Sequence, residues 1–181
     1  SVVEFGLSLA KAAIGSFIDS LINLMIQVDE TESAFMRATG ASRDMAKEVT
    51  ANTQEMAFYG VELKELNETM KELYTTYTDF TMISADQRAE LKNTGALLGE
   101  LGVSNKDFAQ SIQTSTKMFG ETAISAAGTA REMTSLAQII GVTPQQMSAD
   151  FASMGTSLAK MGDQGVRAFK DLAIVSKTTG L

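Results

Sequence analysis

The 181-residue chain has no cysteine, histidine or tryptophan, and it has a single proline. Without cysteine it can form neither a disulfide nor a thiolate metal site. Without histidine it lacks the commonest metal ligand and the commonest general base at neutral pH. The near-absence of proline, together with 11 methionines and many good helix formers, predicts an almost wholly helical chain.

The chain also lacks a run of Lys and Arg, and its net charge is −7. An acidic chain without a basic patch has no electrostatic footprint for DNA or RNA, so we expect no specific nucleic-acid binding. The sequence begins at Ser1 and ends at Gly180-Leu181, inside a turn-like motif. We interpret it as part of a longer polypeptide; the alternative is a processed N-terminus.

A heptad pattern runs from Val3 to Phe80, where apolar residues recur in alternating steps of four and three, apart from three polar positions. A heptad of this length is typical of a coiled-coil seam with a left-handed supercoil. As one helix, these 78 residues would span roughly 117 Å. We therefore predict that residues 1–80 form a long coiled-coil helix whose oligomer interface comprises Leu7, Ile14, Phe17, Leu21, Leu24, Val28, Phe35, Met45, Val49, Asn52, Met56, Tyr59, Leu63, Leu66, Met70, Leu73, Tyr77 and Phe80.

Residues 14–26 are apolar on almost every side of the expected helix. Such a helix is buried in an assembly or in lipid. Glu4, Lys11 and Asp19 lie in or near this stretch, and they disfavour a conventional transmembrane span of about 18 to 20 uncharged residues. The two interpretations are therefore a tight oligomer core and a segment that enters a membrane on a trigger.

Two positions could interrupt the rod. Asn52 is polar at a seam position, and it either pairs with its copy in a neighbouring chain or marks local looseness. Gly40 could end one helix and Ser42 could cap the next. Because the heptad register continues through Gly40, we favour a kinked rod over two unrelated helices.

Residues 84–181 show a different pattern, a helical repeat. Ser84 and Gln87 have the spacing of a capping box that starts a helix. Gly102, Gly141 and Gly180 follow at intervals of 39 residues. We expect the helix-turn residues to be Gly40, Ser42, Ser84, Gly102, Ser104, Gly141, Thr143, Pro144 and Gly180, with glycine ending a helix, Ser or Thr capping the next, and Pro144 at its first position.

The repeat extends into the helices themselves. The segment Arg131–Ala137 matches Arg167–Ala173, with a three-residue indel before the glycine. A fixed period of this size, made of a helix, a glycine turn and a capped helix, indicates a repeat architecture. Further glycines inside the expected helices, which are Gly120, Gly128, Gly155, Gly162 and Gly165, indicate either close crossings in a static bundle or soft helices that extend easily.

The chain resembles the tape measure proteins of tailed bacteriophages. Residues 136–144 (LAQIIGVTP) and 35–42 (FMRATGAS) carry most of the likeness. The resemblance implies one part of a much longer protein that lies in the tail tube lumen, sets tail length, docks on the baseplate hub and leaves on ejection. It also implies a parallel homo-oligomer, most simply a trimer, and transient contact with the host membrane.

Two other classes of function suit parts of the sequence. One is a membrane-active translocator or toxin-like protein, which residues 14–26 would suit. The other is an enzyme, with candidate carboxylates Asp86 and Glu90 or the group Glu62, Glu65 and Glu68 one helical turn apart. Charges at that spacing normally form a solvated face, and EF-hand spacing is absent. We therefore expect no catalytic, metal or cofactor residue.

Overall fold

The computed structural model describes residues 2–179, with the side chains of residues 15, 16 and 18–179. Over these residues the protein is all-α, and it contains no β-strand. In chain order the elements are α1 (Val2–Thr39), α2 (Arg43–Thr50), α3 (Thr53–Ala57), α4 (Leu63–Thr76), α5 (Ala85–Glu100), α6 (Asn105–Met118), α7 (Ala123–Ile140), α8 (Pro144–Leu158), the 3₁₀-helix η1 (Ala159–Gln164) and α9 (Gly165–Thr179).

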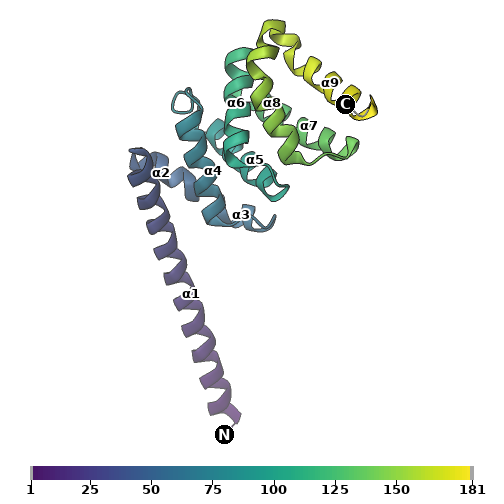
Figure 1. Ribbon diagram of the computed structural model, residues 1–181. Helices are drawn as coiled ribbons and strands as arrows, with labels where there is room; N and C mark the ends of the chain where they lie inside the picture. The colour runs from purple at the N-terminus through teal and green to yellow at the C-terminus, as the bar shows by residue number, and fades with distance from the viewer. Residues whose placement is uncertain (1, 180–181) are drawn as a thin grey trace.

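The prediction of a coiled-coil helix over residues 1–80 is wrong. Helix α1 ends at Thr39, where Gly40 adopts a left-handed φ of +71°. Two more left-handed residues, Asn52 (φ +64°) and Gly60 (φ +87°), separate α2, α3 and α4. The chain therefore folds back after α1 into a compact bundle, and α1 extends away from it (Figure 1).

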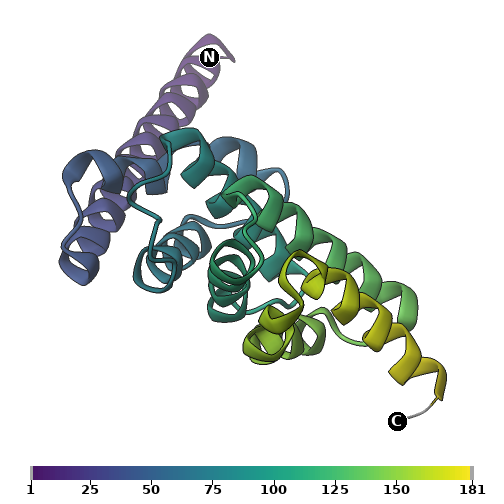
Figure 2. The same ribbon diagram turned by 90° about the horizontal axis from the view of Figure 1, so that it is seen from above.

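Helices α4 to α9 stack in two rows. Helices α4, α6 and α8 form one row, and α5, α7 and α9 form the other (Figures 1 and 2). Each helix packs on a sequence neighbour and on the next helix of its own row, as α6 does on α7 and α8. Because the turns at Gly102 and Gly141 occupy equivalent places in this stack, the period of the sequence corresponds to one helix from each row.

The predicted helix punctuation is confirmed wherever the structure describes it. Ser84 accepts a hydrogen bond from the backbone N–H of Gln87 at 3.2 Å, and the Gln87 side chain completes the capping box. Gly102 and Gly141 adopt left-handed φ values of +92° and +72°. The remaining N-caps, Ser42, Ser104 and Thr143, accept equivalent bonds, and Pro144 begins α8. Gly180 lies outside the described residues.

The main core crosses the predicted boundary between residues 80 and 84. One cluster of buried apolar side chains joins Phe35 on α1 and Leu73 on α4 to Phe108 on α6 and Ala130 on α7. Residues 35–80 therefore share a core with the repeat region and do not form a separate rod. A second cluster holds α6 to α9 together, with Phe151 of α8 between Phe119 and Phe169 at ring-centroid distances of 6.0 and 5.1 Å.

Glycines allow close helix crossings at specific points. A Cβ added to Gly155 of α8 would lie 2.5 Å from Cγ2 of Thr114 on α6, and one added to Gly95 of α5 would lie 2.6 Å from the ring of Phe108. Of the glycines that we expected inside helices, Gly120 and Gly162 instead have left-handed φ values at helix breaks. The interpretation of close approaches therefore applies to Gly155 and to Gly165 of α9, which lies against the ring of Phe119, and not to the whole set.

Candidate functional site

Exposed large apolar side chains gather most densely on one stretch of α1 in the described structure. Six side chains, each at least 44% exposed, define what we call the α1 apolar surface: Ile18, Leu21, Ile22, Leu24, Met25 and Ile26. They are exposed because this part of α1 extends beyond the bundle (Figure 1). A contiguous exposed apolar patch of this kind marks a protein or membrane contact.

The apolar surface has a polar boundary toward the bundle. Asp29 and Glu30 lie beside Ile26 and Met25 in a shallow depression on α1. A wider groove of about 750 Å³ then runs from Leu24 to Val61 and Leu63 at the start of α4. The surface can therefore bury aliphatic side chains, each worth about 1.5–3 kcal/mol when fully covered, but it holds no group suited to bond-breaking chemistry.

Many of the predicted interface residues are not available to another chain. Eight of them are buried within this chain, so their assignment to an oligomer seam is wrong: Phe35, Val49, Met56, Leu66, Met70, Leu73, Tyr77 and Phe80. Val28, Met45 and Leu63 are half-buried, and Tyr59 is exposed away from any continuous helix. Leu21 and Leu24 belong to the α1 apolar surface. The side chains of Leu7, Ile14 and Phe17 lie outside the described ones.

Asn52 does not sit in a helical seam. It is exposed and adopts the left-handed conformation just before α3. Asn tolerates this conformation better than most residues. The interpretation of a buried Asn pair in a continuous coiled coil is therefore wrong.

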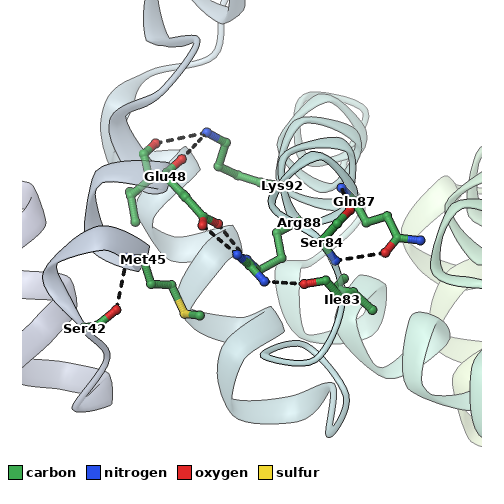
Figure 3. Close-up of polar contacts among 9 residues, drawn as sticks. Ser42, Met45, Glu48, Ile83, Ser84, Gln87, Arg88 and Lys92 are labelled. Atoms are coloured by element: carbon green, nitrogen blue, oxygen red, sulfur yellow. Dashed lines mark hydrogen bonds and ion pairs between the residues drawn. The ribbon is translucent and has the colours of Figure 1, made fainter.

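Sequence reasoning missed a buried ionic cluster between α2 and α5. The ammonium of Lys92, which is 0% exposed, donates to the carbonyl of Glu48 at 2.6 Å (Figure 3). It also donates to the carbonyl of Ala51 at 2.7 Å, with a longer contact of 3.3 Å to that of Val49. A cation at this position satisfies carbonyls that the end of α2 leaves without helical partners. In the sequence, the only indication of this cluster is that Lys92 lies on the face of α5 that also carries the buried Leu91 and Gly95.

Arg88 completes the cluster one helical turn earlier on α5. Its guanidinium forms a two-pronged ion pair with the carboxylate of Glu48, with both N···O distances 2.7 Å, and it also donates to the carbonyl of Ile83 (Figure 3). Burial lowers the pKa of Lys92 to about 8, and the charge of Glu48 opposes this shift. All polar groups of the cluster face one another, so it joins α2 to α5 and presents no open site.

The candidate carboxylates also have structural roles. The side chain of Glu65 accepts the backbone N–H of Glu62 at 2.7 Å in the capping box of α4. Glu90 pairs with Arg131 of α7 at 2.7 Å. Glu65 also raises the pKa of the exposed Glu100 through a hydrogen bond and like charge. In the part of the chain that the structure describes, no group of acidic residues could hold a metal ion, and no helix has the length and hydropathy of a membrane span.

The chain matches no protein-family model, and neither a curated protein nor a solved structure shows significant similarity to it. The assignment of a function therefore depends on the residues and surfaces described above.

Proposed function

We propose that this chain is part of a phage tape measure protein, with a structural and not an enzymatic role. The motifs around Gly40 and Gly141 support this proposal, because they turn helices at the places where the resemblance expects turns. The single observation that carries it furthest is α1. A 38-residue helix of about 57 Å that exposes an apolar surface outside the bundle suits a protein that packs side by side with other copies along this helix.

In this proposal the α1 apolar surface joins copies of the chain in parallel, most simply as a trimer, inside the tail tube and near the baseplate hub of the virion. The heptad spacing of Leu21, Leu24 and Val28 fits such a seam. The bundle that follows would contact tail tube or hub proteins during assembly in the host cytoplasm. Release on ejection would then require the bundle to open.

A ruler is tested by changing its length. Deleting residues 102–140 joins Leu101 to Gly141, so one repeat is removed while the turn sequence is kept. If the repeat region is open in the tube, with its helices end to end, tails should shorten by about 58 Å, which is 39 residues at 1.5 Å each. If the two-row stack stays closed, the change should be about 10 Å, the spacing of two packed helices. Duplicating the same residues should lengthen tails by the same amount. Tail lengths measured in electron micrographs that stay unchanged in both variants would refute the ruler role.

The oligomer is tested separately by light scattering. Leu21→Asp and Leu24→Asp together should convert the assembled chain to a monomer, because each places a carboxylate in the seam. Ile139→Asp is the matched control, since Ile139 is 81% exposed on α7, away from α1. A wild-type chain that is already monomeric at micromolar concentration would contradict the parallel seam.

The α1 apolar surface also favours a second candidate, a membrane-active translocator or toxin-like protein. Such a helix could lie along a lipid surface with its aliphatic side chains inserted. Dye release from liposomes by the whole chain, compared with that of Ile22→Asp, separates the two. Release that the substitution abolishes supports the second candidate, and no release at micromolar protein rules it out.

A further inference from the structure

The open end of the two-row stack carries an apolar groove between α8 and α9. We call it the α8–α9 groove; it has a volume of about 540 Å³. Its floor is formed mainly by Met147 and Met154 of α8 and by Phe169 and Leu172 of α9. Asp150 and Lys177 lie at its rim, one from each helix. None of these residues belongs to the α1 apolar surface.

The row of α4, α6 and α8 shows how the fold fills such a groove. Helix α8 packs on α6 and α7, with Gly155 of α8 against Thr114 of α6. Ser111 and Ser115, on the same side of α6 as Thr114, are 3% and 1% exposed. The repeat of 39 residues relates these two serines to Asp150 and Met154 of α8. Asp150 is exposed and Met154 is half-buried. On α8, the face that corresponds to the α8-covered face of α6 is therefore exposed.

The other row gives the same result independently. Met133 and Ala137 of α7 are 2% and 0% exposed and share the second core cluster with α8. The match between residues 131–137 and 167–173 relates them to Phe169 and Ala173 of α9. Both of these line the groove. Phe169 is 3% exposed because it packs on Phe151, but Ala173 is half-buried, and Leu172 is 50% exposed whereas its α7 counterpart Leu136 is half-buried. The groove thus has the surface on which a further helix of the first row would lie.

We propose that the α8–α9 groove binds one more helix of the α8 type, joined to α9 through Gly180-Leu181 as α8 is joined to α7 through Gly141-Val142. The properties of this additional helix follow from those of α8. The helix is amphipathic, with apolar residues at the positions of Met147 and Phe151, and it has a glycine or another small residue where Gly155 crosses α6 at Thr114. This inference does not depend on the proposed function, because it uses only the repeat and the groove.

The test extends the whole chain by a copy of residues 143–158 placed directly after Leu181. Gly180-Leu181 matches Gly141-Val142, but three more residues separate it from the segment 167–173 than separate Gly141 from 131–137. The copy is therefore also placed in a second chain that lacks residues 177–179, which restores the spacing of the repeat. We expect the copy to become helical by circular dichroism and the amides of α9 to exchange at least about tenfold more slowly, which corresponds to 1.4 kcal/mol of added protection. The matched control carries Met147→Asp and Phe151→Asp within the copy only.

A second variant tests whether the added helix binds in the α8–α9 groove. Leu172→Asp changes an exposed side chain, so it leaves the fold intact, but it should abolish the extra protection in the extended chain. Two results would overturn the proposal. In the first, α9 exchanges at the same rate with and without the copy. In the second, the unmodified chain dimerises and Leu172→Asp abolishes the dimer, because then a second copy and not a repeat helix occupies the groove.

Discussion

Lys92 allows the sharpest quantitative prediction. In Lys92→Met the aliphatic part of the side chain is kept, but the carbonyls of Glu48 and Ala51 lose donors at 2.6 and 2.7 Å. The net contribution of a hydrogen bond to a charged group is about 1.5–3 kcal/mol, desolvation included. Using the low end for the two short bonds, we expect the free energy of unfolding to fall by about 3 kcal/mol at neutral pH.

The same residue predicts a pH dependence. Burial depresses the pKa of Lys92 from 10.5 to about 8. Between these values the unfolded chain binds a proton that the folded chain has released, so the free energy of unfolding rises with pH, by about 1.4 kcal/mol per unit. The neutral amine keeps two N–H donors for the two close carbonyls. The rise should be absent from Lys92→Met.

The assay is urea unfolding followed by circular dichroism at several values between about pH 7 and 9.5. This range lies below the one in which Tyr77, whose pKa burial raises above 10, would lower stability. Lys64→Met is the matched control, because the Lys64 side chain is 78% exposed and its ion pair with Glu68 is on the surface. A Lys92→Met variant within 0.5 kcal/mol of wild type, or with the same pH slope, would refute the reasoning.

Three further predictions concern stability and can be measured by the same unfolding assay. Gly155→Ala should lower the free energy of unfolding by about 1–3 kcal/mol through overpacking against Thr114. Adding Thr114→Ser, which removes the contacting methyl group, should restore most of this loss. If it restores none, the loss does not come from the contact with Thr114. Phe151→Ala should cost about 3–5 kcal/mol, because the ring joins α6, α8 and α9 in the second core; a loss under 1 kcal/mol contradicts that role. Ser84→Ala should lower the free energy of unfolding by about 1 kcal/mol, because it removes the N-cap of α5, while Ser84→Asp should retain most of the stability. An equal loss in both variants would argue against capping by this side chain.

The sequence by itself determined the helical class, the turns and the caps. These features are local: a left-handed glycine, a Ser or Thr hydroxyl three residues before a backbone N–H, and a proline at the first helical position interact within one or two turns of the chain. The turns at Gly102 and Gly141 could therefore be located from the residues around them alone. The turn at Gly60 was missed, although Glu62 and Glu65 beside it have capping-box spacing.

Only the tertiary structure decided which partner each apolar face meets. The heptad spacing of Met70, Leu73 and Tyr77 is the same whether the facing helix comes from another chain or, as here, from the same one. The buried cluster of Lys92 and Glu48 joins residues 44 positions apart, so no local pattern could indicate that these two residues meet. Spacing along a helix determines which side is apolar, but the three-dimensional path of the chain determines what covers that side, and in α1 it leaves Leu21 and Leu24 uncovered.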